Sequence, residues 1–288
     1  MALSINQNIM AMNSYRNLTN TQSGLGKSLE KLSSGFRVNR AADDAAGLAI
    51  SEGLRSLVRG NKQAVRNAQD GISVVQTAEG ALNEVHDIIQ RARELVIQAA
   101  NDSNDSNARD DIKAELTELK SEVDRIAKTT EFNGQMLLDA ENAATLNFQV
   151  GARGTENDRI QVTTVDISTV SSAIQAAIDV DTTDQENANA SYRETLKNAA
   201  GDAGLDIALQ TVSTARAQLG AIQNRFEHTI NNLNVAVENL AASESRIRDT
   251  DMAQEMMNFT KNNILQQAGT AMLAQANQVP QAVLSLLR

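Results

Sequence analysis

Both ends of this chain carry an apolar stripe with helical spacing and no folded core of their own to pack into. Apolar residues recur through residues 1–36 and 252–284 at steps of mostly three, four or seven, which places their side chains on one helix face. Chain termini normally fray, so two apolar helical termini on one chain need a partner. The nearest partners are each other and the same ends of neighbouring copies, so the pattern predicts an assembling subunit. The residues expected at the assembly contacts are Ile5, Ile9, Met12, Leu18, Leu25, Leu29, Leu32, Met252, Met256, Phe259, Ile264, Leu265, Met272 and Leu284.

The composition favours long helices packed side by side. The 288 residues include one proline, two tyrosines, five phenylalanines and no tryptophan, so small and aliphatic residues do most of the burying. A single proline leaves nearly the whole chain free to be helical. Hydrophobic residues make up 41% of the chain, which is ordinary for a folded protein. There is no cysteine, so disulfide and thiolate chemistry are excluded.

Helical periodicity predicts four long helices. The first runs from about residue 5 to 33 and is interrupted over 33–47, where Asp44 is a suitable N-cap for the next helix. From Leu54 to Ala99 the steps of three and four persist, which at 1.5 Å per residue predicts a rod of roughly 70 Å. The polar run 101–107 would let the chain reverse into a third helix that carries Ile112, Leu116, Leu119, Val123 and Ile126.

The spacing of apolar residues changes between about 145 and 168. There, β-branched residues and period-two alternation predict two short strands around a turn. This is the only segment predicted to be β. The polar residues 180–200 are expected to join the two arms, and a fourth long helix follows from about Ala208 to Ile247, ahead of the helical stripe at 252–284. The predicted fold class is therefore mainly α: a long antiparallel helical bundle or coiled coil built from both chain arms, with a small β-hairpin region at the tip.

The net charge of −10 is unevenly distributed and argues against nucleic acid as a partner. Residues 1–45 carry +2 and residues 246–288 carry +1, so residues 46–245 carry −13. Phosphate binding needs a basic stripe, which this acidic middle does not offer. No window has the ~18–20 apolar residues of a membrane span, so membrane insertion is not expected. The N-terminus also lacks the basic and apolar regions of a signal peptide, so if the protein leaves the cell, we expect a route that reads no cleaved leader.

No set of residues predicts catalysis, a metal site or a cofactor. The Asp43–Asp44 pair has no third carboxylate at ligand spacing and is better explained as a turn and helix cap. His86 and His228 lie on different long helices without a close histidine partner, so surface or flank positions are expected. No nucleophile, base and orienting group recur at a workable spacing, so the chain is predicted not to be an enzyme.

Several long motifs closely resemble bacterial flagellin. In the outgoing arm these are LEKLSSGFRVNRAADDAAGLAIS (29–51), QDGISVVQTAEGAL (69–82), QRARELVIQAAN (90–101) and EFNGQMLL (131–138). In the returning arm they are RAQLGAIQNRFEHTINNL (216–233), SRIRDTDMAQEM (245–256) and NNILQQAGTAMLAQANQVPQAVLSLLR (262–288). Both arms match in the right order.

The resemblance implies a structural subunit that polymerises into the flagellar filament for swimming motility. It implies that residues 1–45 and 246–288 form a terminal coiled-coil inner core with a connecting spoke, and that residues 46–245 form an outer rod with the hairpin at about 145–168. About 65 residues separate EFNGQMLL from the returning helix, so no separate folded outer domain is expected. The subunit would be exported unfolded through the flagellar type III apparatus and would reside in the extracellular filament. Its partners would be other flagellin subunits, the hook-filament junction protein, the filament cap and an export chaperone.

The resemblance also implies recognition by host innate immune receptors. By motif match, Arg91, Leu95 and Glu115 fall where the vertebrate Toll-like flagellin receptor binds sensitive flagellins. Considered alone, the Arg/Glu alternation of QRARELV would indicate only a solvated helix face with weak ion pairs.

Two other classes of protein compete with this interpretation. A hook-filament junction protein shares the out-and-back plan and similar terminal helices, and would form short caps or no polymer. A helical signalling or chaperone rod would remain cytoplasmic and would not co-purify with sheared surface appendages.

Overall fold

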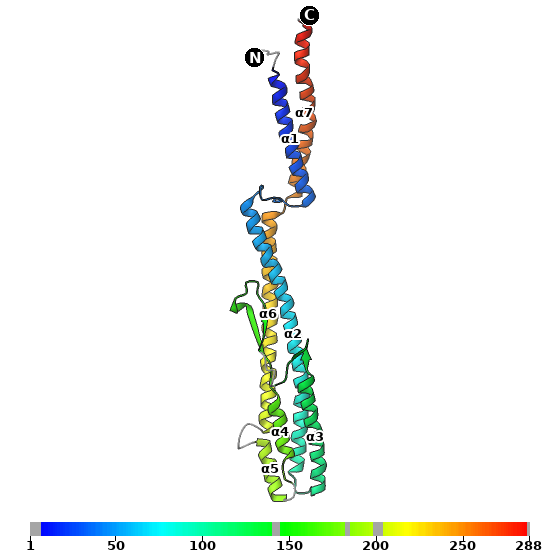
Figure 1. Cartoon of the computed structure of the whole chain (residues 1–288), viewed down its shortest axis with the longest axis vertical. Helices are drawn as coiled ribbons and strands as arrows, with labels where there is room; N and C mark the ends of the chain where they lie inside the picture. The colour runs from blue at the N-terminus through cyan, green and yellow to red at the C-terminus, as the bar shows by residue number, and fades with distance from the viewer. Residues whose placement is uncertain (1–6, 140–144, 182–184, 198–203, 287–288) are drawn as a thin grey trace. The chain divides into compact units, whose positions relative to one another are not determined.

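The computed structural model describes residues 7–139, 145–181, 185–197 and 204–286 (Figure 1). The chain divides into two compact units: unit 1 comprises Met1–Val58 with Glu238–Arg288, and unit 2 comprises Arg59–Val237. The helices are α1 (Ile9–Ser34), α2 (Ala45–Ala99), α3 (Ser106–Thr129), α4 (Ser168–Ile178), α5 (Gln185–Lys197), α6 (Leu205–Arg248) and α7 (Met252–Leu286). The strands are β1 (Glu131–Phe132), β2 (Gln135–Met136), β3 (Thr145–Gln149) and β4 (Arg159–Thr163), with a short 3-10 turn, η1 (Glu156–Asp158), before β4.

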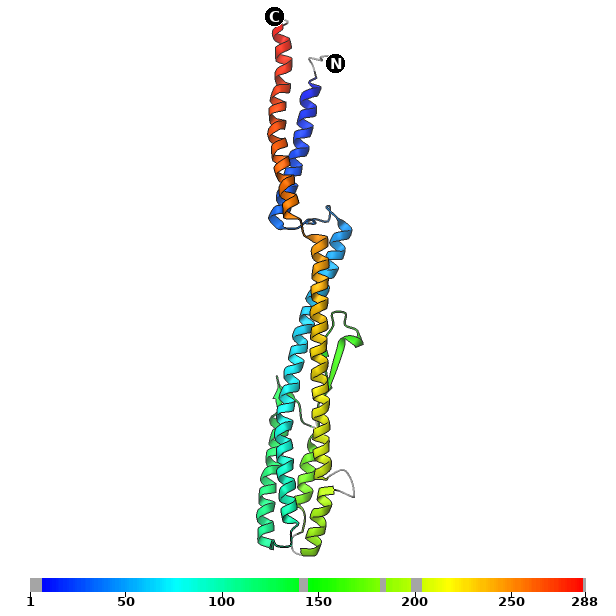
Figure 2. The ribbon, with the colours of Figure 1, turned by 180° about the vertical axis from the view of Figure 1, so that it is seen from behind.

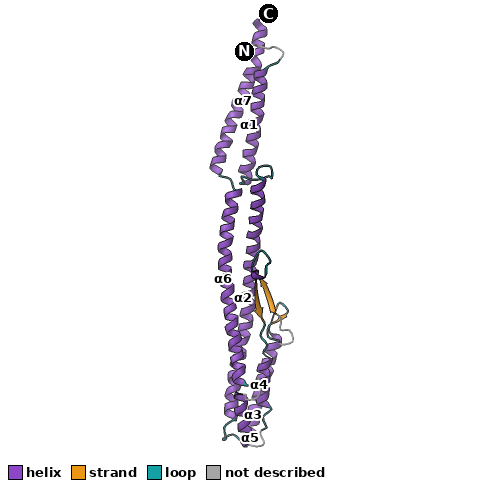
Figure 3. Cartoon of the chain, turned by 90° about the vertical axis from the view of Figure 1, so that its left-hand side faces the viewer, coloured by secondary structure: helices purple, strands orange, loops and turns teal. Residues whose placement is uncertain are grey.

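The fold is mainly α with two small antiparallel hairpins, which confirms the predicted class (Figure 3). The predicted break after the first helix is also confirmed. Gly35 has a left-handed φ of 75° and caps the end of α1, because its N–H donates to the carbonyl of Lys31 at 2.8 Å. Asp44 caps the start of α2, since its Oδ1 accepts the N–H of Gly47 at 2.8 Å.

The core of unit 2 follows the predicted three-four spacing. On α2 the fully buried side chains are Ala68, Val75, Leu82, Val85, Ile89, Ala92, Val96 and Ala99. They pack with Leu116 and Val123 of α3, with the inner face of α4, and with Leu205 and Phe226 of α6. The predicted apolar faces of residues 54–99, the third helix and the returning helix therefore cover one another, as expected for long helices whose stability comes from packing.

The predicted hairpin forms from β3 and β4, with Thr145 opposite Thr163 and Gln149 opposite Arg159. The hairpin lies along the side of α2 and not at the predicted tip. Its contact with α2 includes a hydrogen bond in which Asn67 Nδ2 of α2 donates to the carbonyl of Gln149 at 2.9 Å. Phe148 of β3 meets Phe226 of α6 edge to face, with ring centroids 5.6 Å apart. These contacts give the hairpin an aromatic anchor on the long helices.

A second hairpin, β1–β2, was not predicted. It turns at Asn133 and Gly134, both with positive φ (51° and 77°). Asn-Gly between short extended segments is a strong hairpin signal, so the motif EFNGQM could have predicted the β1–β2 hairpin.

The prediction that residues 180–200 join the two arms did not include a helix, but α5 occupies much of this segment. Ala188 and Tyr192 are buried and Leu196 packs against the core, at steps of four along one face. A polar composition hid this sparse apolar stripe, which gains its stability from unit 2. The preceding helix α4 packs against α3 and was likewise not predicted.

Candidate assembly surface

Helices α1 and α7 run side by side in opposite directions within unit 1, as both Figure 1 and Figure 2 show. Asn8 Nδ2 donates to the carbonyl of Ala276 at 2.8 Å, and so ties the start of α1 to the far part of α7. A Cβ added at Gly269 would lie 3.3 Å from Leu18 Cδ1, and glycine therefore lets the two helices approach closely there.

The seam between these two helices buries very little. Among the side chains that the structure describes on α1 and α7, only Ser28, Glu255 and Ala276 are buried. None of the three is a large apolar residue. The pair therefore lacks the interior that burial of Leu, Ile or Val would provide, in contrast to the helices of unit 2.

Most of the large apolar side chains described on this pair are exposed. Fifteen large apolar residues in the described part of the chain are exposed, and the three in unit 2 are Ile97, Ile207 and Val235. The other twelve are in unit 1: Ile9, Met10, Met12, Tyr15, Leu29, Ile50, Met252, Met256, Met257, Ile264, Leu265 and Met272. A concentration of exposed apolar side chains on one unit is typical of an interaction surface.

The predicted assembly residues divide into two groups in a single chain. Eight are exposed: Ile9, Met12, Leu29, Met252, Met256, Ile264, Leu265 and Met272. Four are half-buried: Leu18, Leu25, Leu32 and Phe259. Ile5 lies outside the described residues, and Leu284 lies in α7 at a position whose side chain the structure does not describe. Four exposed apolar residues of unit 1 were not predicted: Met10 and Tyr15 on α1, Ile50 on α2 and Met257 on α7.

Two grooves follow this surface. One, of about 510 Å³, is lined on α7 by Met256, Met257, Thr260, Lys261, Ile264 and Leu265. The other, of about 890 Å³, lies at the outer part of the α1–α7 pair and includes Ile9, Met12, Tyr15 and Leu273. Apolar side chains of a second molecule could fill both grooves.

The predicted receptor residues occupy the α2–α3 face of unit 2. The Arg91 guanidinium pairs with Glu115 of α3 at 2.8 Å and with Glu94 of α2 at 3.5 Å. The hydrogen bond to Glu115 raises the pKa of Arg91. Arg91 and Glu115 are both exposed, whereas Leu95 is 2% exposed and belongs to the core of unit 2. The structure thus brings the two charged residues together and buries Leu95 in the core.

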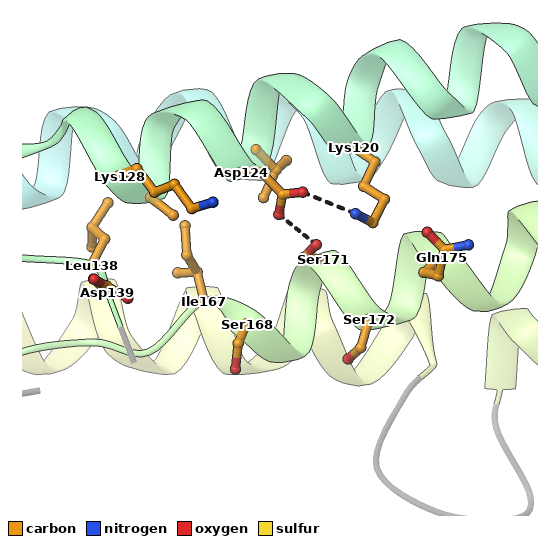
Figure 4. Close-up of a pocket in the computed structure, with 12 residues that line it drawn as sticks. Lys120, Asp124, Lys128, Leu138, Asp139, Ile167, Ser168, Ser171, Ser172 and Gln175 are labelled. Carbon is orange, nitrogen blue, oxygen red and sulfur yellow. Dashed lines mark hydrogen bonds and ion pairs between the residues drawn. The ribbon is translucent and has the colours of Figure 1, made fainter. Parts of the chain in front are cut away.

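A groove of about 350 Å³ lies between α3 and α4, with lysines and serines around an apolar floor (Figure 4). Asp124 accepts hydrogen bonds from Ser171 Oγ at 2.6 Å and from Lys120 Nζ at 2.9 Å. Burial raises the pKa of Asp124, but these two hydrogen bonds and the positive charges of Lys120 and Lys128 together outweigh it and leave the pKa below its ordinary value. Asp124 is thus an ionised structural group that fastens α4 to α3.

The surroundings of the two histidines do not indicate a catalytic pair or a metal site. His228 is exposed, and His86 is half-buried with its Nε2 2.8 Å from Gln90 Nε2 on the same helix. Across residues 7–139, 145–181, 185–197 and 204–286, no three His, Asp or Glu side chains are grouped as a metal ion requires. Within the same described ranges, no helix has the length and apolar character needed to cross a membrane.

The matches to known proteins cover both arms of the chain. Residues 5–143 match the model of the bacterial flagellin N-terminal helical region, and residues 202–287 match that of the C-terminal helical region. The chain belongs to the bacterial flagellin family. It is 52% identical to flagellin of Halalkalibacterium halodurans over 284 residues, or 99% of each chain. It is 47% identical to the flagellar filament 33 kDa core protein of Treponema phagedenis, again over 99% of each chain.

Flagellins are structural proteins, and the resemblance inferred from the motifs is confirmed by these matches. Among solved structures, one described as a flagellar hook-associated protein of Vibrio parahaemolyticus aligns with a TM-score of 0.61. That alignment covers 72% of this chain and 100% of the other, at 14% identity. Identity this low shows a shared fold alone, so the family assignment comes from the flagellin matches.

Proposed function

We propose that this chain is a structural subunit that polymerises into a bacterial flagellar filament and thereby serves swimming motility. The observation that carries the proposal is the outward-facing apolar surface of α1 and α7, on a chain 52% identical to a flagellin. Burying each of these side chains against a neighbouring copy would contribute roughly 1.5–3 kcal/mol. Head-to-tail contacts that do not close a ring generate a helical filament.

Within the filament, residues 1–45 and 246–288 would form the inner core and the connecting spoke, and residues 46–245 the outer rod without a separate folded outer domain. The assembly contacts would include Ile9, Met12, Ile264 and Leu265. Their exposure in a single chain supports this, since an assembly contact must be free before the partner arrives. The subunit would act without catalysis or a cofactor.

The finer partners follow from the same proposal. The chain would be secreted unfolded through the flagellar type III apparatus and would contact an export chaperone, the filament cap and the hook-filament junction protein. A chain without cysteine suits this route, because no cross-link has to be broken before passage. Nucleic acid and membrane insertion have no part in it.

Truncation tests the assembly surface directly. A chain that lacks residues 254–288 should remain soluble and largely helical, because the core of unit 2 is intact, but should not polymerise. Electron microscopy and sedimentation of the full chain and the truncated chain give the comparison. Normal filament growth by the truncated chain would contradict the proposed role of α7.

The rival function is that of a hook-filament junction protein. The flagellin relatives align over 99% of their length, whereas the hook-associated structure supports the fold only, which favours the filament subunit. Long filaments grown from purified full-length chain would support the subunit, and short caps or the absence of polymer would support the rival.

Host receptor recognition is a second proposed function of the Arg91, Leu95 and Glu115 region. The exposed Arg91–Glu115 pair offers both charges to a partner, and Leu95 is buried in the core of the same unit. Arg91→Glu should abolish activation of reporter cells that express the receptor, while far-UV circular dichroism stays unchanged. Arg93→Glu is the matched control, because Arg93 is as exposed but pairs with Asp206 of α6 instead.

A further inference from the structure

The two segments that connect the helices of unit 1 pair with each other. One follows α1 and begins at Gly35, and the other joins α6 to α7 over residues 249–251. Phe36 and Asp249 form an isolated antiparallel bridge. The N–H of Arg37 donates to the carbonyl of Arg248 at 2.6 Å, and the N–H of Thr250 donates to the carbonyl of Gly35 at 3.0 Å. We call this paired region, residues 35–38 with 248–250, the clasp.

So short a pairing needs side chains to hold it. A two-stranded ladder of ordinary length is already marginal in water, and the clasp is shorter still. Arg248 supplies the missing contacts, because its side chain is only 12% exposed and reaches two other elements. Its Nη1 donates to Glu52 Oε1 of α2 at 2.8 Å, and its guanidinium carbon lies 4.6 Å from the centroid of the Phe36 ring.

This geometry uses the particular chemistry of arginine. A guanidinium can stack flat on an aromatic ring while its edge donates to a carboxylate, which an ammonium cannot do in the same place. The residue therefore connects α2, the end of α6 and the segment after α1 through one side chain. On the other side of the clasp, Arg37 Nη2 donates to the carbonyl of Ile247 at 2.5 Å and so satisfies one of the last carbonyls of α6.

The clasp connects the two helices of the assembly surface, α1 and α7, which are far apart in sequence. Helix α1 ends at Ser34 and α7 begins at Met252, so the clasp joins the C-terminus of one to the N-terminus of the other. Two segments tied at one point pair as an intramolecular event, with a high effective concentration. Without that tie, α1 and α7 would be held only by their separate connections to α2 and α6.

We propose that Arg248 is a positioning residue for assembly, which through the clasp makes α1 and α7 order together as one surface. This inference rests on the proposed function as a filament subunit. Its direct consequence is that loss of the guanidinium weakens polymerisation even though Arg248 is not among the predicted assembly contacts.

Arg248→Ala tests the proposal, and Arg246→Ala is the matched control. Arg246 lies two residues earlier on the same helix, is exposed, and donates to Ser243 Oγ of its own helix at 3.2 Å. Both full-length variants and the unaltered chain are elongated from seeds of the unaltered filament, and the critical concentration is measured. We expect about a tenfold rise for Arg248→Ala, equivalent to ~1.4 kcal/mol, and no change for Arg246→Ala.

Two further measurements separate positioning from simple loss of stability. Amide hydrogen exchange in the grown filaments should speed up at Arg37 and Thr250 in Arg248→Ala alone, while the thermal unfolding of unit 2 stays the same in every variant. Arg248→Lys should not restore the critical concentration, because it keeps the charge but loses the guanidinium group that lies over the Phe36 ring.

Failure of the Arg248 inference and failure of the proposed function give different results. If Arg248→Ala matches Arg246→Ala in critical concentration and exchange, or if Arg248→Lys restores both, the role of the guanidinium is overturned while the filament function stands. If the unaltered chain forms no filaments at all, the proposed function fails, and the inference fails with it.

Discussion

In unit 2, Val75, Leu82 and Ile89 of α2 are fully buried, whereas in unit 1 Met12, Ile264 and Met272 are each more than half exposed. All six residues lie on helices with the same three-four periodicity. The difference is in what covers the apolar face. Unit 2 brings α2, α3, α4 and α6 together. In unit 1, the buried side chains that the structure describes on α1 and α7 are Ser28, Glu255 and Ala276, and none of them is large and apolar. Periodicity thus reveals that a helix has an apolar face without revealing whether the same chain covers it.

The largest expected effect is on unfolding, and it should be confined to unit 2. Leu82→Ala should lower the free energy of unfolding by about 2–5 kcal/mol, because it leaves a cavity in a closed core. Leu265→Ala removes the same atoms from an exposed site, and should change the stability of the monomer by less than about 0.5 kcal/mol. Urea unfolding of both monomeric variants measures the contrast. Equal losses would mean that unit 1 has a closed core after all.

The second effect is on assembly, and it should be confined to unit 1. Leu265→Asp should leave monomer stability unchanged but raise the critical concentration for polymerisation about a hundredfold or more, since an unpaired charge would be buried between molecules. Leu265→Met, which conserves volume and apolar character, is the control. Filaments of normal yield from Leu265→Asp would show that this residue faces solvent in the polymer.

A third contrast concerns how tightly the helices of unit 2 pack. A Cβ at Gly71 would lie 2.6 Å from Phe226 Cζ, and Phe226 is fully buried, so Gly71→Ala should destabilise by about 1–3 kcal/mol through overpacking. Gly80 lies on the same helix with open space around it, so Gly80→Ala should stabilise by up to about 1 kcal/mol through helix propensity. Thermal unfolding of the two variants should shift in opposite directions.

The smallest effect is pH-dependent. The pKa of Asp124 is lowered in the folded state, so its contacts with Ser171 and Lys120 stabilise the fold at pH values above the ordinary pKa of 3.8. This stabilisation is lost as the pH falls through the pKa of the folded state. Asp124→Asn should therefore lower stability by about 0.5 kcal/mol near neutral pH, since the pair is partly exposed. The difference from the unaltered chain should vanish well below pH 3.8. A difference that persists in acid would indicate a packing effect instead.

The sequence predicted the parts of the fold that depend on neighbours along the chain. The three-four spacing of α2, α3 and α6, the Asp44 cap and the β3–β4 hairpin are all local signals, and each is confirmed. Helix α5 was missed because its polar sequence carries only a sparse apolar stripe, and that stripe is stable only where unit 2 covers it. The β1–β2 hairpin was missed although Asn133–Gly134 marks its turn.

What the sequence by itself determined is the family, the long helices and the presence of apolar faces at both ends, because motifs and periodicity are written in consecutive residues. Only the tertiary structure decided which of those faces are covered, that Arg91 meets Glu115, and that Arg248 meets both Glu52 and Phe36. These partners lie 24 residues apart or farther along the chain, 196 for Arg248 and Glu52. The physical reason is that a long-range contact depends on how folded elements pack, and the local preference of either residue does not encode its distant partner.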